Sequence, residues 1–160
     1  MRILGIDPGT SLIGYGLIET SKNTLRALKF DKFETEKNLS SKDRVLKIFN
    51  FFNKLIRETR PDKISIESLF FFKNSKTIIS VSEIRGVLLL VAAKNNIDVS
   101  EFTPLQVKQA VSNYGRAEKE QVQRMVKLIL GLDVIPKPDD VADALALAIC
   151  CANTIVYENN

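Results

Sequence analysis

Short apolar runs separated by turn residues occupy the first fifth of the chain. Residues 1–7, 12–18 and 24–35 each have the length and residue types of a β-strand, and Pro8-Gly9-Thr10-Ser11 forms a tight turn between the first two. Because a connection this short joins strands that run in opposite directions, these residues predict an antiparallel hairpin followed by a third strand.

Helical and strand patterns alternate along the rest of the chain. Apolar residues recur with a helical period from Ser41, a plausible helix cap, to Pro61, which ends the helix. Further elements are predicted as strands at 62–67 and 97–102 and as helices at 77–95, 103–112, 117–130 and 139–156. This order indicates a mixed α/β sheet with helices on its faces, and the absence of repeats or linkers indicates one domain over residues 1–160.

The composition is that of a soluble globular protein of ordinary core size, with 45% apolar and 26% charged residues in 160. The chain contains no apolar run of membrane-spanning length and does not begin with the pattern of a secretory signal, so we expect no membrane contact and a cytoplasmic location. Cys150 and Cys151 are neighbours in a predicted helix, and neighbours so placed rarely pair, so they are interpreted as reduced core residues.

A mild basic excess, with a net charge of +4 and a pI of about 9.1, is unevenly distributed. Basic residues crowd the middle and late chain at Lys73, Lys76, Arg85, Lys108, Arg116, Lys119, Arg124 and Lys127. A basic surface around an acidic pocket suits a polyanion that is brought to a bound metal. Charge alone does not separate this interpretation from an ordinary solvated surface.

Two carboxylates end predicted strands. Asp7 ends the first strand directly before Pro8, which holds Asp7 extended and directs its side chain off the strand end. Glu67 ends a neighbouring apolar strand and is expected to face Asp7 across the sheet. Carboxylates at the ends of buried elements are unfavourable unless a positive charge compensates them.

Two further carboxylates lie in the first turn of the last predicted helix. Asp140 and Asp143 are three residues apart and therefore share one face of that helix, near the positive end of its dipole. Spacing alone does not exclude Asp139, which is four residues from Asp143 and equally able to share its face. Taken singly, such residues are more often helix caps, but with two strand-end carboxylates they favour a functional cluster.

A hard divalent cation is the compensating charge that these residues favour. Clustered carboxylates repel one another, and a chain with no histidine and two cysteines offers oxygen ligands of the kind that Mg²⁺ prefers. Two Mg²⁺ ions about 4 Å apart would relieve the repulsion, activate a water and stabilise the leaving oxygen of a phosphodiester. Mn²⁺ can substitute, because it accepts the same ligands.

The chain resembles the RuvC family of bacterial Holliday junction resolvases, within the ribonuclease H-like superfamily. The matching stretches run in family order over nearly the whole chain. They are Gly5-Ile6-Asp7-Pro8-Gly9-Thr10, Gly14-Tyr15-Gly16, Ile66-Glu67 with Phe70, Lys73-Asn74, Arg85-Gly86-Val87, Pro104-Leu105-Gln106-Val107-Lys108-Gln109, Ala117-Glu118-Lys119-Glu120-Gln121-Val122 and Asp140-Val141-Ala142-Asp143-Ala144-Leu145-Ala146. Asp-Pro-Gly alone would be weak, whereas the complete series is highly specific.

The resemblance implies a fold and a catalytic set. It implies a ribonuclease H-like mixed five-stranded sheet flanked by helices on both faces, and a metal-dependent endonuclease that makes paired, symmetric cuts in four-way junction DNA during recombination and repair. It implies that Asp7, Glu67, Asp140 and Asp143 are the catalytic, metal-binding quartet, with Asp139 outside it.

The resemblance also implies partners and DNA contacts. Lys108 and Lys119 match family lysines near the catalytic cleft, and Phe70 matches an aromatic residue that handles unstacked bases. With their basic neighbours they make up the expected DNA-binding set, Phe70, Lys73, Lys76, Lys108, Arg116 and Lys119. The family implies a homodimer with two active sites, and a branch-migration motor of the RuvA and RuvB type as partner.

Departures from the family pattern fall on one predicted helix, at Ser75-Lys76-Thr77 and Glu83, where we expect the dimer interface. Three alternative functions remain: a non-catalytic junction- or RNA-binding module, an RNA-processing relative, and a phosphotransferase of the actin and sugar-kinase type. A binding module would be expected to lack a ligand, and none is missing. A phosphotransferase needs a second domain and a second glycine-rich phosphate loop, and neither is found here.

Overall fold

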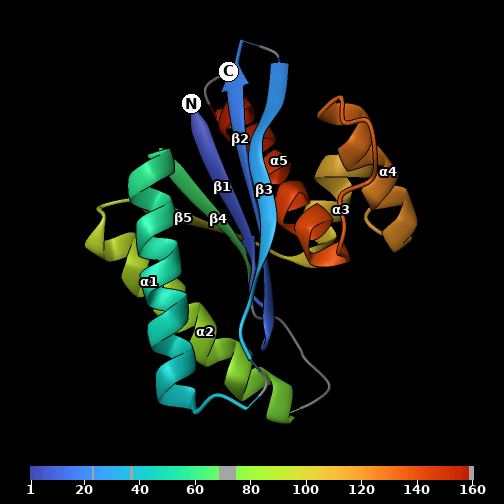
Figure 1. Cartoon of the computed structure of the whole chain (residues 1–160). Helices are drawn as coiled ribbons and strands as arrows, with labels where there is room; N and C mark the ends of the chain where they lie inside the picture. Colours follow the sequence, from blue (N-terminus) through green and yellow to red (C-terminus); the bar gives the residue numbers. More distant parts are fainter. Residues whose placement is uncertain (23, 37, 69–74, 159–160) are drawn as a thin grey trace.

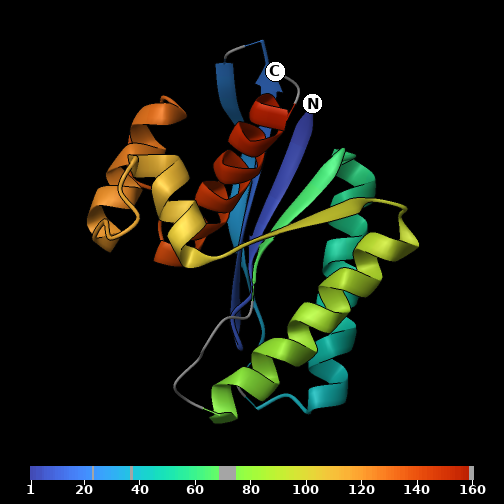
Figure 2. The same cartoon turned by 180° about the vertical axis from the view of Figure 1, so that it is seen from behind.

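One five-stranded sheet runs through the protein, with helices on both of its faces (Figures 1 and 2). The computed structural model describes residues 1–22, 24–36, 38–68 and 75–158, with side chains omitted at 75–77 and 156–158. The strands lie in the order β3-β2-β1-β4-β5, so β1 is the central strand. The predicted mixed sheet is confirmed.

The first three strands are antiparallel and the last two are parallel to β1. They comprise β1 (Arg2–Asp7), β2 (Leu12–Ser21), β3 (Thr24–Glu34), β4 (Lys63–Glu67) and β5 (Asp98–Phe102). The predicted hairpin is confirmed, since β1 and β2 pair in opposite directions with Asp7 opposite Gly14. β2 extends three residues beyond its predicted end at Ile18, because it continues to pair with β3 as far as Ser21.

Five helices occupy the described part of the chain, close to their predicted positions. They comprise α1 (Ser41–Thr59), α2 (Ser75–Lys94), α3 (Pro104–Ser112), α4 (Lys119–Ile129) and α5 (Asp139–Glu158). The predicted cap at Ser41 was wrong by one residue, because the side chain of Ser40 accepts the hydrogen bond from the Asp43 amide. α4 begins two residues later than predicted, since Glu118 has extended backbone angles and is the N-cap.

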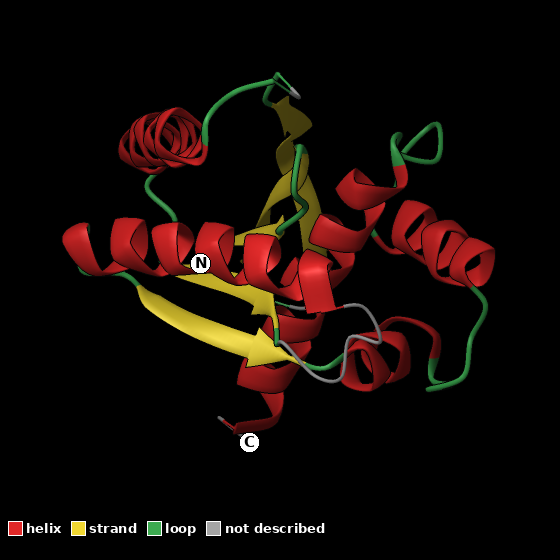
Figure 3. Cartoon of the chain, turned by 90° about the horizontal axis from the view of Figure 1, so that it is seen from below, coloured by secondary structure: helices red, strands yellow, loops and turns green. Residues whose placement is uncertain are grey.

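The two faces of the sheet carry separate apolar clusters, as the alternation of side chains along a strand requires. On β1, Leu4 and Ile6 pack with α1 and α2, whereas Ile3 belongs to the cluster of α3, α4 and α5. Seen from below, the helices flank the strands on both sides (Figure 3). Arg85 of α2 forms an ion pair with Glu101 of β5, which ties that helix to the edge of the sheet.

The α5 helix lies directly on the centre of the sheet because glycines remove the side chains between them. A Cβ at Gly5 would lie 1.9 Å from the Ala144 carbonyl oxygen, and one at Gly14 would lie 2.0 Å from the Asp140 carbonyl oxygen. The buried Ser65 hydroxyl of β4 donates a hydrogen bond to the Leu147 carbonyl at 2.8 Å. The strands therefore fix the depth of α5 at the turn that carries the predicted active-site residues.

The cysteines of α5 are both free and buried, as predicted. Burial, together with the neighbouring Cys151, raises the pKa of the Cys150 thiol to about 12, so this thiol is unreactive at neutral pH. None of the helices in the described part of the chain combines the length and apolar character needed to cross a bilayer.

Two glycines on β2 provide a graded test of this packing. Gly14→Ala places a methyl group against helix backbone, whereas at Gly16 the nearest atoms belong to the Leu145 side chain, with Cδ2 at 2.5 Å and Cγ at 2.7 Å. We expect Gly14→Ala to lower the free energy of unfolding by about 3 kcal/mol or more, and Gly16→Ala by about 1 kcal/mol. Urea unfolding of both variants measures the difference, and equal losses would contradict the close approach of α5.

Candidate active site

Two predicted site residues meet at the ends of neighbouring parallel strands. Ile6 of β1 pairs with Ile66 of β4, so Asp7 and Glu67 follow at adjacent positions. Both lie on the α5 face of the sheet, because side chains alternate and Ser65, two residues before Glu67, bonds to α5. The prediction that Glu67 faces Asp7 across the sheet is confirmed.

The start of α5 brings the other two predicted carboxylates to the same place. The Asp140 carbonyl abuts Gly14 of β2, which is the residue opposite Asp7 in the hairpin. Asp143 lies on the next turn and faces the sheet with a side chain that is 35% exposed. The pairing of β1 with both neighbours and the packing of α5 thus gather residues that are far apart in the sequence.

A cleft of about 250 Å³ opens between these elements and the helices α3 and α4. Its acidic side consists of Asp7, Glu67 and Asp143, and two basic residues, Lys108 and Lys119, face them. The apolar wall consists of Pro104, Val107, Val122 and Leu147. Asp140 does not line the cleft itself.

The four carboxylates act on one another electrostatically. Burial raises the pKa of Asp7 to about 8, assisted by the negative charges of Asp143, Glu67 and Asp140 and opposed by Lys119. Burial also raises the pKa of Glu67, and the charge of Asp143 adds to the effect. The pKa of Asp143 is raised by burial, although the neighbouring Lys119 lowers it. Asp140 therefore belongs to the cluster by its charge.

Asp139 lies apart from this cluster. Its side chain is 42% exposed and contacts Lys137 Nζ at 3.2 Å and Lys119 Nζ at 3.5 Å. A hydrogen bond from Lys137 is the main cause that lowers the pKa of Asp139. The charge of Asp139 raises the pKa of Asp143 but is not among those that raise the pKa of Asp7. Asp139 thus touches the cluster only at Asp143 and lies outside the cleft lining, which sequence spacing did not predict.

The donor chemistry of the cleft fits a hard cation. The oxygens of Asp7, Glu67 and Asp143 border one space, and burial raises the pKa of all three more than Lys119 lowers it, so their ionised forms favour further positive charge. Among the described residues, no group of three or more His, Cys, Asp or Glu side chains is already arranged to hold a metal ion. Lys119 Nζ, 3.2 Å from Asp143 Oδ2, supplies the one short ionic contact to the carboxylates inside the cleft.

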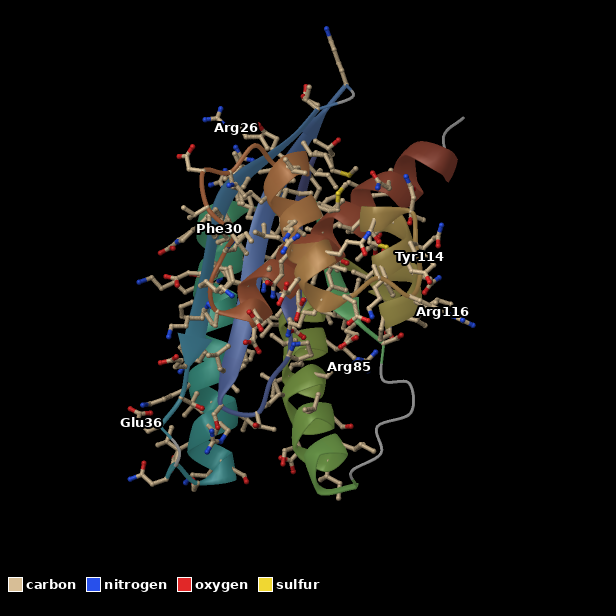
Figure 4. The ribbon with its side chains drawn as sticks, turned by 90° about the vertical axis from the view of Figure 1, so that its right-hand side faces the viewer. Arg26, Phe30, Glu36, Arg85, Tyr114 and Arg116 are labelled. Atoms are coloured by element: carbon tan, nitrogen blue, oxygen red, sulfur yellow. The ribbon has the colours of Figure 1, made fainter. Side chains whose placement is uncertain are left out.

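The predicted DNA-binding residues fall into three groups. Lys108 and Lys119 line the cleft. Arg116 lies on the outer edge beside α3, with Tyr114, and not in the cleft lining (Figure 4). Phe70 and Lys73 lie outside the described residues, as does the side chain of Lys76.

Two features of the site were not predicted from the sequence. The apolar wall contributed by Val107 and Val122 has the same helical spacing as core residues, so no local signal separated it from the core. The direct contact of Lys119 with α5 was also missed. Its only signal was the location of this lysine near a predicted helix start, next to other charged residues.

The fold and the position of the carboxylates define a ribonuclease H-like nuclease. The yeast mitochondrial Holliday junction resolvase shares the fold, with a TM-score of 0.68 at 18% identity, over 98% of this chain and 83% of that one. A RuvC of Thermus thermophilus in complex with a Holliday junction substrate superposes with a TM-score of 0.95 at 32% identity, over 99% of this chain and 96% of that one.

The family model of crossover junction endodeoxyribonuclease RuvC matches residues 3–151. A relative of that name from Ruminiclostridium cellulolyticum is 54% identical over 96% of this chain and 93% of its own length. Another from Heliobacterium modesticaldum is 51% identical over 98% and 97%. The chain belongs to the RuvC family, and the resemblance seen in its motifs is confirmed.

The raised pKa of Asp7 predicts that Asp7→Asn increases the free energy of unfolding of the metal-free protein by an amount that depends on pH. The unfolded chain releases this proton near pH 3.8 and the folded chain near pH 8, so the wild type loses stability as the pH rises between these values. Asparagine does not ionise, so the variant does not lose this stability. Its free energy of unfolding should exceed that of the wild type by on the order of a few kcal/mol above pH 8, and by little below pH 4.

Urea unfolding in a chelator at pH 4, 6 and 9 measures this gain. Asp133→Asn, at an exposed carboxylate of the loop before α5, is the control and should show no comparable rise. A gain for Asp7→Asn that is equal at all three pH values would contradict the raised pKa.

Proposed function

We propose that this protein is a structure-selective endonuclease that resolves four-way DNA junctions by hydrolysing one phosphodiester in each of two symmetry-related strands. The observation that carries this function is the cleft in which the acidic residues Asp7, Glu67 and Asp143 face Lys108 and Lys119. A phosphodiester is an anion that needs cationic neighbours, while its hydrolysis needs carboxylates that orient and activate water. The lining of the cleft offers both.

Asp7, Glu67, Asp140 and Asp143 would hold two Mg²⁺ ions, which Mn²⁺ can replace. When bound in such sites, the ions lower the pKa of a water and stabilise the leaving oxygen. Lys108 and Lys119 bind the phosphate opposite the carboxylates, and the apolar wall limits the access of bulk water.

The wider DNA surface includes basic residues outside the cleft. Arg116, which is exposed beside α3, would contact phosphates there, and Lys73 and Lys76 would add further phosphate contacts. Phe70 would stack on or wedge between bases. All these contacts belong to one nuclease domain of residues 1–160, acting in the cytoplasm with a branch-migration motor of the RuvA and RuvB type.

Cleavage of a synthetic four-way junction, beside a linear duplex of the same sequence, tests the function. We expect paired, symmetric nicks in the junction with Mg²⁺ and little cutting of the duplex. Asp7→Asn should lower the rate by at least about a hundredfold and leave junction binding intact, because the variant keeps the lysines and loses one proposed ligand.

The outcomes separate the alternatives. Junction binding without cutting, in both Mg²⁺ and Mn²⁺, would favour a non-catalytic binding module. Equal cutting of RNA or duplex would retain the metal chemistry and contradict the junction substrate. Robust cutting by Asp7→Asn would contradict the catalytic assignment of Asp7.

We also propose that the active form is a homodimer that pairs through α2. One face of this helix, on the far side from its core contacts, bears Ile79, Glu83, Gly86 and Leu90. Ile79 is 64% exposed and Leu90 is 58% exposed, and the position of Gly86 is open, with no heavy atom within 4 Å of an added Cβ. A two-fold protein presents one cleft to each of two equivalent strands of a junction.

A charge at the exposed apolar position Leu90 should prevent dimerisation. Leu90→Asp buries a carboxylate in the proposed interface, so we expect a monomer and the loss of paired cuts, with the fold retained. Sedimentation or size-exclusion measurements report the mass. Leu128→Asp, at a leucine of α4 that is 71% exposed on the other face of the sheet, is the matched control and should remain dimeric. A dimeric Leu90→Asp protein would contradict this interface.

A further inference from the structure

The N-termini of α4 and α5 meet at the rim of the cleft through one lysine and two aspartates. Lys119 is the first residue of α4, and its Nζ lies 3.2 Å from Asp143 Oδ2 and 3.5 Å from Asp139 Oδ2. Asp139 is the first residue of α5. Lys119 therefore bridges a carboxylate inside the cleft and one outside it.

The position of Lys119 is opposed by its own helix. The N-terminus of a helix carries a partial positive charge, which disfavours a cation in the first turn. Glu118, the N-cap residue of α4, makes no side-chain capping hydrogen bond, although Glu120 adds a negative charge to the same turn. The carboxylates of α5 make the ionic contacts with the ammonium group.

The two carboxylates that contact Lys119 have different surroundings. Asp143 lines the cleft with Asp7 and Glu67, where a bound cation would claim its charge. Asp139 does not line the cleft, and its other oxygen accepts a hydrogen bond from Lys137 at 3.2 Å. When a cation occupies the cleft, Asp139 Oδ2 is therefore still available to Lys119.

We propose that Asp139 is a positioning residue that shares Lys119 Nζ with Asp143 in the metal-free protein and retains it when a cation takes Asp143, so that the lysine does not compete with the cation and remains available to a phosphate. This inference rests on the proposed metal-dependent function. Without Asp139, the ammonium group would pair with Asp143 alone and occupy the space that a cation needs.

Two further side chains orient the Asp139 carboxylate. Lys137 Nζ donates a hydrogen bond to Asp139 Oδ1 at 3.2 Å, and Gln123 donates another to this carboxylate. Gln123 is 5% exposed, so its amide is anchored in the base of α4. The helix that carries Lys119 thus also helps to orient the carboxylate that holds Lys119.

A simpler explanation is that Asp139 attracts cations by its own negative charge. The two explanations differ in their dependence on Lys119. If Asp139 acts by charge alone, Asp139→Asn weakens cation binding equally whether or not Lys119 is present. If it acts by positioning, the effect requires the lysine. A double-mutant cycle separates them.

The experiment measures the Kd of Mg²⁺ by calorimetry, without DNA, in the wild type, Asp139→Asn, Lys119→Met and the double variant. We expect Asp139→Asn to raise the Kd of Mg²⁺ about two- to fivefold, because this factor corresponds to the free energy of an exposed ion pair. In the Lys119→Met background, the same change should have little effect. Asp139→Glu, which retains the charge, should restore most of the affinity, and Asp133→Asn controls for the loss of one nearby surface charge.

Junction cleavage supplies the second measurement. Asp139→Asn should raise the Mg²⁺ concentration for half-maximal rate by the same factor, with a similar maximal rate at saturating Mg²⁺. Equal losses with and without Lys119 would overturn the positioning role and leave the proposed function intact. If the wild type does not bind Mg²⁺, both the positioning role and the proposed function are overturned. If Asp139→Asn weakens Mg²⁺ binding only when Lys119 is present, but no variant cleaves a junction, the positioning role is supported and the nuclease function is rejected.

Discussion

The close packing of α5 against the central strands is the contact on which the site depends. Gly5 and Gly14 allow the backbone of α5 to rest directly on β1 and β2, and Ser65 adds a buried hydrogen bond from β4. A larger residue at either glycine would lift the helix by the width of a methyl group. Since Asp140 and Asp143 lie in the first turns of this helix, their distance from Asp7 is set by backbone contacts rather than by flexible side chains.

This packing brings together charges that oppose the folded state. The carboxyls of Asp7, Glu67 and Asp143 all have raised pKa values because they are removed from water and repel one another. The rest of the protein offsets this cost through two apolar clusters, one on each face of the sheet. Stability is thus lowered at the place where a cation and a phosphate would be bound, as is common at sites built for function.

Lys119 moderates this repulsion without removing it. Its ammonium group lowers the pKa of Asp7 and Asp143, yet it stands at the rim and not at the centre of the carboxylates. The cleft therefore combines carboxylates for a cation with Lys108 and Lys119 for a phosphate. Opposite charges in one lining suit a reaction in which a cation, a water and a phosphodiester meet.

The sequence by itself determined the elements, the mixed sheet, the four candidate carboxylates and the family, because strand and helix periods and short motifs are local properties of the chain. It misplaced only element ends, such as the cap at Ser40 and the start of α4. Tertiary structure alone decided that Lys119 bridges Asp139 and Asp143 and that Arg116 lies outside the cleft. Those outcomes depend on how deeply α5 packs and how α4 approaches it, and contacts between elements distant in the chain leave no periodic signal in the sequence.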